Sequence, residues 1–313
     1  MASLRVAIMT DETGWHTRQL QAALRERGAV GRCIDLAACR IDTTAAWHGL
    51  AIPGLGRELP DAVLVRGIAG GSFEQVTKRL GVLHALRELG VPVYNDARAI
   101  ERSVDKSMTS LLLHAARIPT PPTWATESLA EAQRIVTRES AAGHALVLKP
   151  LFGSQGKGLV RVGWVDGVHH ALPALGAEFG GLAYLQRFIA PTKAPGFDWR
   201  VLVIGGRAVA AMRRTSEHWI HNVAQGARCE PALLSGDLAR LAERAAQALD
   251  MDYAGVDLMP AGAGASIQVI EVNGVAAWQG LQGVSRLNIA RAIVADLLDR
   301  KLAAARGVAA RRA

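Results

Sequence analysis

Residues 146–158, LVLKPLFGSQGKG, carry two lysines on either side of a glycine-rich turn. The first half is an apolar run, typical of a strand, that ends at Lys149, and Lys157 follows between two glycines. Glycines let backbone N–H groups approach an anion closely, and ammonium groups neutralise its charge. The stretch therefore predicts a loop that binds a chain of phosphates.

This loop does not have the Walker pattern G-x-x-x-x-G-K-[ST], because Leu151 occupies the first glycine position and Gly158 follows Lys157. The residues that follow it, LVRVGW (159–164), alternate like a strand and not like a helix. We therefore expect the glycines at the tip of a β-hairpin, where they close over the phosphates as a lid.

A second group of polar residues interrupts two apolar strands near the C-terminus. Asp257 lies in AGVDLM, and Glu271 and Asn273 lie in VIEVNG. Side chains two apart on a strand face the same way, so Glu271 and Asn273 project together, and a neighbouring strand can bring Asp257 beside them. Mg²⁺ prefers oxygen ligands and takes one or two carboxylates while nucleotide phosphates complete its shell. The pattern predicts a magnesium site.

Composition limits the class of protein. The chain has 313 residues, half of them hydrophobic, which is enough for two or three packed lobes. A net charge of +8 and a pI near 9.9 favour an anionic partner. Three scattered cysteines exclude a disulfide framework, and no signal-peptide or membrane-spanning pattern is present, so we expect a soluble cytoplasmic protein.

The order of strand and helix patterns indicates three lobes. Strands alternate with amphipathic helices over residues 1–97, which is typical of a doubly wound parallel sheet. Prolines after a helix at about 103–118 introduce a small α+β unit, and Gly205-Gly206 then marks a hairpin. The expected ranges are 1–97, 98–186, 187–305 with one C-terminal helix from about Arg286, and a basic tail at 306–313.

In this order, seven segments carry a resemblance to a known family: VDKSMTSLLL, LVLKPLFGSQGKG, YLQRFI, DWRVLVIGGRAVAAMRR, HNVAQGA, AGVDLM and IEVNG. Together they resemble the ATP-grasp superfamily, and within it the RimK-like carboxylate–amine ligases. The segments RGIAGGSFEQ and VYNDARAIERSVDK are most similar to α-L-glutamate ligases that act on tetrahydromethanopterin. The resemblance implies an α/β ATP-grasp fold with an N-terminal pre-ATP-grasp lobe, a lid lobe and a C-terminal lobe with a mixed sheet.

The resemblance also implies roles for single residues. It assigns the nucleotide to Lys106, Lys149, Ser154, Gln155, Gly156, Gln186, the backbone of Arg187 and Phe188, Asp198 and Asn222. Asp257, Glu271 and Asn273 would hold two Mg²⁺ ions, with Mn²⁺ as an alternative. Arg214 would stabilise the reacting charge and Arg200 would hold the acceptor carboxylate. Arg66 and Trp278 are our candidates for contact with the substrates. Trp278 follows Asn273 by five residues, so we expect it to form an aromatic wall of the acceptor pocket on which a pterin or furan ring would stack.

The family reaction uses ATP to phosphorylate a carboxylate, and an amine then attacks the acyl phosphate to form an amide. The expected function is the addition of L-glutamate to a one-carbon-carrier coenzyme of the tetrahydromethanopterin or methanofuran type, by a homo-oligomer. Many relatives continue the metal motif as N-x-x-P-G, whereas this sequence reads NGVAAWQG, so a protein or peptide C-terminus stays open as the acceptor. A non-catalytic protein that binds anions or nucleic acid is the alternative from another class, but the intact ligand residues argue against it.

Overall fold

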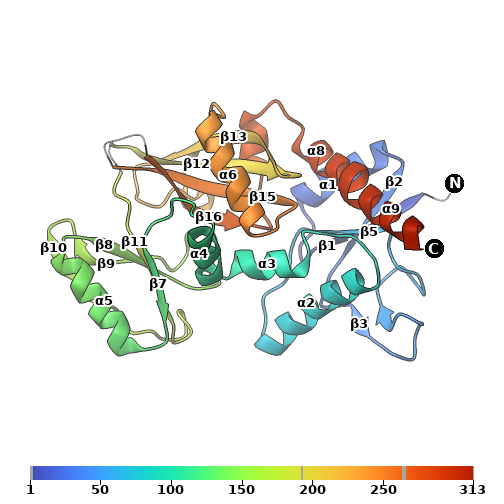
Figure 1. The fold of residues 1–313 in the computed structure, drawn as a ribbon, viewed down its shortest axis with the longest axis horizontal. Coiled ribbons are helices and arrows are strands. Elements are labelled where there is room, and N and C mark those ends of the chain that lie inside the picture. The colour runs from blue at the N-terminus through green and yellow to red at the C-terminus, as the bar shows by residue number, and fades with distance from the viewer. Residues whose placement is uncertain (1–2, 192, 263–265, 313) are drawn as a thin grey trace.

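The computed structural model describes residues 3–191, 193–262 and 266–312, which form three lobes in a row (Figure 1). The N-terminal lobe has a parallel sheet of order β2-β1-β5-β6. Its elements are β1 (Leu4–Met9), α1 (Trp15–Glu26), β2 (Ala29–Ile34), β5 (Ala62–Val65), α2 (Phe73–Glu88) and β6 (Val93–Tyr94), and β3 (Arg40–Ile41) pairs with β4 (Leu50–Ala51) beside it.

The predicted doubly wound packing of this sheet is confirmed by its two buried faces. Val6 and Ile8 of β1 pack with α1 and the C-terminal helices, whereas Ala7 and Met9 pack with α2. Successive side chains on a strand point to opposite faces, so one apolar run supplies both cores. Helix α1 ends before Gly28, whose φ of 70° is the left-handed conformation expected of a C-terminal stop.

The chain then crosses to the lid lobe through two helices, where the sequence predicted one. Asp105 separates α3 (Ala97–Val104) from α4 (Lys106–Ala115) and caps α4 by accepting hydrogen bonds from two of its N–H groups. The lid has a five-stranded antiparallel sheet of order β10-β9-β8-β11-β7. It comprises β7 (Thr123–Thr126), α5 (Leu129–Ala141), β8 (Ala145–Lys149), β9 (Val160–Val165), β10 (Val168–His170) and β11 (Ala183–Arg187).

The C-terminal lobe is a five-stranded sheet of order β14-β13-β12-β15-β16, covered by α6 (Gly236–Ala248). We expected a mixed sheet, but its four strand pairs are all antiparallel. The strands are β12 (Gly196–Ile204), β13 (Arg207–Ser216), β14 (Arg228–Pro231), β15 (Tyr253–Ala261) and β16 (Ser266–Asn273), with η1 (Val223–Gln225) before β14. The hairpin predicted at Gly205-Gly206 joins β12 to β13.

The last helices return to the N-terminal lobe, where they lie against α1 (Figure 1). Helix α7 (Gln279–Val284), which the sequence did not predict, precedes them and packs on β13 and β14. The helices that return are α8 (Ile289–Ala295), which packs on α1, and then η2 (Asp296–Leu302) and α9 (Ala303–Arg312). Their apolar side chains share one core with β1 and α1, whereas the lid has a separate core between α5 and its own sheet. The first and third lobes are thus packed together, and the lid is attached as a separate unit.

None of the described helices combines the length and the apolar character needed to cross a membrane.

Candidate active site

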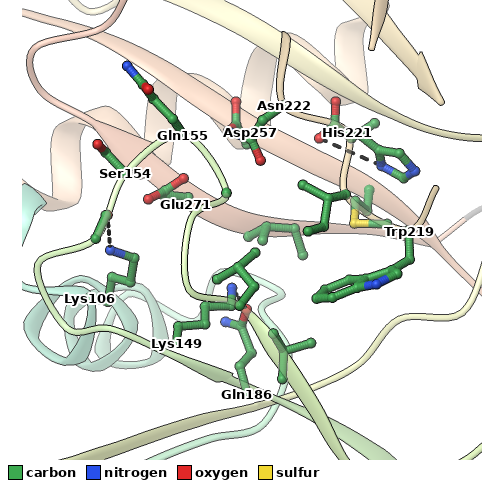
Figure 2. A pocket seen from close by; sticks show the side chains of 18 of the residues that line it. Lys106, Lys149, Ser154, Gln155, Gln186, Trp219, His221, Asn222, Asp257 and Glu271 are labelled. Atoms are coloured by element: carbon green, nitrogen blue, oxygen red, sulfur yellow. Dashed lines mark hydrogen bonds and ion pairs between the residues drawn. The ribbon is translucent and has the colours of Figure 1, made fainter. Parts of the chain in front are cut away.

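A cleft between the lid and the C-terminal sheet brings most of the predicted residues together (Figure 2). It holds about 1030 Å³ of space, open solvent at its mouth included. The lid contributes the ends of β8 and β11 and the glycine-rich loop, and the C-terminal lobe contributes β15, β16 and residues 219–222. The predicted residues in its lining are Lys106, Lys149, Ser154, Gln155, Gly156, Gln186, Arg187, Phe188, Asp198, Arg214, Asn222, Asp257 and Glu271.

The glycine-rich loop is the turn of an antiparallel hairpin between β8 and β9, as the sequence predicted. Its tip reaches the opposite wall of the cleft. A Cβ atom on Gly156 would lie only 2.7 Å from the side-chain oxygen of Asn222 and 2.7 Å from a methyl carbon of Ile220. Gly156 also has a φ of 72°, so glycine serves both the left-handed turn and the close approach.

Two lysines face the cleft without a carboxylate partner. Lys106 Nζ donates to the carbonyls of Leu151 and Gly153, at 3.1 and 2.5 Å, and so holds the base of the loop. Lys149 Nζ donates to Gln186 Oε1 at 2.6 Å. Neither lysine forms an ion pair with any residue that the structure describes. Two ammonium groups at the base of a glycine-rich loop are suited to bind phosphate oxygens.

Burial lowers the pKa of both lysines. It lowers the pKa of Lys149 to about 8, although the nearby carboxylate of Glu271 opposes the shift. Burial also lowers the pKa of Lys106, again against the attraction of Glu271. Both shifts mean that the charged form of each lysine is poorly solvated in the cleft. A bound polyphosphate would stabilise this charged form.

The three oxygen donors predicted for the metal lie on neighbouring strands. Asp257 of β15 is directly opposite Glu271 of β16, and Asn273 is opposite Gly255. The Asn273 amide donates to the Gly255 carbonyl at 3.3 Å, and Asn273 itself is not among the residues that line the cleft. Among the described residues, no three His, Cys, Asp or Glu side chains gather as a complete metal site. Two carboxylates and one amide fit Mg²⁺, whose other ligands would be phosphates and water.

Asp257 is held by two arginines. Arg200 donates to its two oxygens, both at 2.7 Å, and Arg214 contacts one of them at 3.0 Å. Arg214 also donates to both oxygens of Asp198, at 2.7 and 2.6 Å. Burial disfavours ionisation of Asp257, but Arg200 and Arg214 more than offset it and lower its pKa. These contacts occupy three of the roughly four lone-pair positions of the Asp257 carboxylate, so a metal ion would share it with the two arginines.

The arginines predicted to be catalytic thus belong to one buried network. Arg214 is 2% exposed and lines the cleft, whereas Arg200 is not among the lining residues. At the other end, burial raises the pKa of Asp198 to about 6 against the pull of Arg214. Arg200 already binds the carboxylate of Asp257 through Nε and Nη2, so only its remaining N–H groups are left for an acceptor carboxylate.

The segment predicted to read adenine has both of its backbone N–H groups bonded within the lid. The Arg187 N–H donates to the Pro122 carbonyl and the Phe188 N–H to the Ala145 carbonyl, both at 2.9 Å. Only the carbonyls of these two residues remain for a base edge. The next amide, that of Ile189, donates to no backbone oxygen within the described ranges. The Arg187 side chain forms an ion pair with Glu139 of α5.

Several residues that line the cleft were not selected by the sequence reasoning, among them Ile189, Trp219 and His221. Trp219 packs edge-on against Phe188, with ring centroids 5.9 Å apart, and the two rings wall one end of the cleft. Burial lowers the pKa of His221 to about 4, so it is neutral near pH 7. The sequence did offer a signal for Trp219 and His221, because the segment HWIHN (218–222) places both within three residues of the predicted phosphate contact Asn222.

We predicted Trp278 as a wall of the acceptor pocket, but the structure places it in the core, with 1% exposure. Its indole packs on Trp15 and His16, each with centroids 4.8 Å away, and its backbone N–H donates to His16 Nε2. After Asn273 the chain turns into the interface between the first and third lobes, which removes Trp278 from the cleft. Arg66 lies at this interface too, where it donates to the Val275 carbonyl at 2.9 Å.

Trp278→Phe is expected to lower the free energy of unfolding by about 1–2 kcal/mol, because a smaller ring leaves part of a closed core unfilled. The Michaelis constants for ATP and for the acceptor should stay unchanged. Denaturant unfolding and steady-state kinetics test the two statements separately. If only the Michaelis constant for the acceptor increased, Trp278 would be part of the substrate site after all.

Comparisons with known proteins agree with this geometry. The RimK-like ATP-grasp domain model matches residues 103–297, and the RimK pre-ATP-grasp domain model matches residues 4–100. Tetrahydromethanopterin:α-L-glutamate ligase of Methanosarcina acetivorans is 30% identical over 94% of this chain and 98% of its own. The protein of the same name from Methanocaldococcus jannaschii is 36% identical over 76% of this chain and 79% of its own.

A solved structure shares the fold. The ATP-grasp ligase PsnB, complexed with a phosphomimetic variant of a minimal precursor, Mg and ADP, superimposes with a TM-score of 0.68. The two chains are 20% identical, and the match covers 96% of this chain and 99% of the other. The predicted fold and family are therefore confirmed, and this chain belongs to the RimK-like ATP-grasp family.

Proposed function

We propose that this protein is an ATP-dependent carboxylate–amine ligase that adds L-glutamate to a carboxylate of a coenzyme of the tetrahydromethanopterin type. The names of the most similar relatives support the choice of substrates. The observation that carries the chemistry is the cleft itself. In it, two lysines that have no ion-pair partner among the described residues face the carboxylates of Asp257 and Glu271 beneath a glycine hairpin.

In this proposal the lid and the C-terminal sheet hold ATP between them. Lys106, Lys149 and the N–H groups of the loop bind the phosphates, and the carbonyls of the 187–188 segment with the Ile189 amide meet the adenine edge. Asp257, Glu271 and Asn273 would hold two Mg²⁺ ions, or Mn²⁺, which supply positive charge against the phosphates. Each residue thereby fixes the triphosphate in one orientation, which is the main contribution to phosphoryl transfer.

The reaction then proceeds in two steps. An oxygen of the acceptor carboxylate takes the γ-phosphoryl group and ADP leaves, which gives an acyl phosphate. The amine of glutamate attacks the acyl carbon, the phosphate leaves, and the amine loses a proton as the amide forms. Arg214, which is buried beside the cleft, is placed to stabilise negative charge in both steps.

Arg66 is our candidate for contact with a substrate carboxylate. It forms no ion pair with any residue in the described part of the chain, and its Nε atom is buried without a partner. Arg66 contacts the carbonyl of Val275, and Val275 lies two residues after the predicted metal ligand Asn273. A partly buried cation with no counter-charge is costly unless a ligand supplies the anion.

The burial of Trp278 removes the aromatic wall that we predicted for a ring-bearing acceptor. The choice of the coenzyme then rests on the resemblance to its relatives, so a peptide C-terminus is the second candidate. Mass spectrometry decides between them. The purified protein is mixed with ATP, Mg²⁺ and glutamate, and with either the pterin-type coenzyme or a panel of peptides. We expect the coenzyme to gain one glutamyl residue with release of ADP. If only the peptides gained a glutamyl residue, the coenzyme would be rejected as the acceptor. If no acceptor formed an amide product, the proposed ligase activity would be rejected.

The loop is expected to change its hydrogen exchange when nucleotide binds. Residues 152–160 include several exposed positions, and their N–H groups gain phosphate acceptors only when ATP is present. Deuterium uptake in this stretch should fall when a saturating ATP analogue and Mg²⁺ are added, whereas uptake in α2, which lies in another lobe, should not change. Equal uptake with and without nucleotide would contradict the role of the loop as a lid.

A further inference from the structure

A chain of buried polar side chains connects Lys149 to helix α4, which carries Lys106. Lys149 Nζ donates to Gln186 Oε1 at 2.6 Å. The Gln186 amide nitrogen donates to Thr123 Oγ1 at 3.3 Å and to the Tyr184 hydroxyl at 3.5 Å. The Tyr184 hydroxyl is in turn 2.9 Å from Ser110 Oγ. Polar contacts therefore run from the end of β8 through β11 to α4.

The strand register explains why these groups meet. Tyr184 is directly opposite Lys149 in the β11–β8 pair, and Gln186, two residues on, faces the same side of the sheet. Ser110 lies one helical turn after Lys106. The hydroxyl of Tyr184 thus touches the helix that presents one lysine, and its ring lies beside the other.

The network also fixes the orientation of the Gln186 amide. An ammonium group can only donate, so Lys149 requires the amide oxygen, and the amide nitrogen must then find acceptors on its other side. Thr123 and Tyr184 supply them. Tyr184 and Gln186 are 2% and 3% exposed, so water is not available to replace a lost partner.

We propose that Tyr184 is a positioning residue for phosphate binding, because its hydroxyl sets the placement of Lys106 and Lys149 relative to each other. This inference rests on the proposed assignment of the two lysines to the phosphates of ATP. The lysines come from a helix and a strand of different packing units, and charges that must meet one polyphosphate require a fixed separation. Ser110 and Gln186 transmit the effect of Tyr184 to the two elements.

The test is Tyr184→Phe, which removes the hydroxyl and keeps the ring. Calorimetry measures the affinity for a non-hydrolysable triphosphate analogue with Mg²⁺, and separately for adenosine, which has no phosphates. We expect the triphosphate affinity to fall about tenfold, as is typical when a group that orients a ligand-binding side chain is removed, and the adenosine affinity to stay constant. Ser110→Ala, which removes the same contact from the helix side, should shift the triphosphate affinity in the same direction.

Tyr94→Phe is the matched control. Tyr94 is another fully buried tyrosine whose hydroxyl donates a hydrogen bond, to Asp296 at 2.6 Å, but it lies in the N-terminal lobe away from the cleft. It should lower stability and leave both affinities unchanged. In a double-mutant cycle, Tyr184→Phe combined with Lys149→Met should lose less triphosphate affinity than the sum of the single losses.

Two results would overturn the inference while the proposed function stands. One is an equal loss of triphosphate and adenosine affinity in Tyr184→Phe, which would show a general packing defect. The other is a triphosphate affinity that stays within twofold of wild type. If the wild-type protein bound adenosine as tightly as the triphosphate analogue, the assignment of the lysines to phosphates would fail, and this inference would fail with it.

Discussion

Glu271→Gln is expected to lower the rate of amide formation by about 100- to 1000-fold, the scale of losing one stabilising group from a reacting charge centre. Glu271 lies opposite Asp257 and is the carboxylate of the cleft without an arginine partner. Asp257 already shares its charge with Arg200 and Arg214, so Glu271 is the main source of unshared negative charge for a metal ion. A neutral amide of the same shape removes that charge without opening a cavity.

Steady-state rates of ADP release with all substrates present measure the effect, and circular dichroism confirms the fold. Glu88→Gln is the control, because it changes the net charge equally at an exposed position of α2. It should retain the wild-type rate. The metal assignment would be wrong if Glu271→Gln turned over at the wild-type rate when Mg²⁺ is limiting.

The sequence predicted those parts of the molecule that depend on local periodicity. Alternating apolar residues after Lys157 indicated that the glycine-rich turn leads into a strand, and β9 follows it. The spacing of Glu271 and Asn273 placed them on one face of β16. The split of β1 between two cores follows in the same way from a short apolar run flanked by helix patterns.

The contacts that the sequence could not predict depend on register between strands far apart in the chain. Arg200 meets Asp257 only because β12 pairs with β15, and Asp198 meets Arg214 only because β12 pairs with β13 in one register. A shift of one residue would send these charges to the other face. Trp278 was placed near the metal residues on sequence distance alone, and the turn after Asn273 carries it into the core.

Lys149→Met is expected to weaken nucleotide binding and to stabilise the nucleotide-free protein. Loss of a buried cation from a phosphate site costs about 2–4 kcal/mol, or roughly 30- to 1000-fold in the dissociation constant. The burial that lowers the pKa of Lys149 from 10.5 to about 8 corresponds to about 3 kcal/mol of unfavourable charge burial near pH 7. Lys149→Met removes this cost, but it also leaves Gln186 Oε1 without its donor. We therefore expect the free energy of unfolding to rise by only about 1–2 kcal/mol.

The stability advantage of Lys149→Met over the wild type depends on pH. Below pH 8 Lys149 is charged in both the folded and the unfolded chain, so the wild type bears the full cost of burying the charge. Between pH 8 and 10.5 the folded chain has released the proton and the unfolded chain has not, so wild-type stability rises and the advantage of Lys149→Met shrinks. Denaturant unfolding at pH 7, 8 and 9.5 measures this, with the exposed Lys157→Met as a control that should change stability by less than about 0.5 kcal/mol. A Lys149→Met protein less stable than wild type at pH 7 would show that Lys149 supports the empty cleft through its bond to Gln186, and that its charge carries no cost for ATP to relieve.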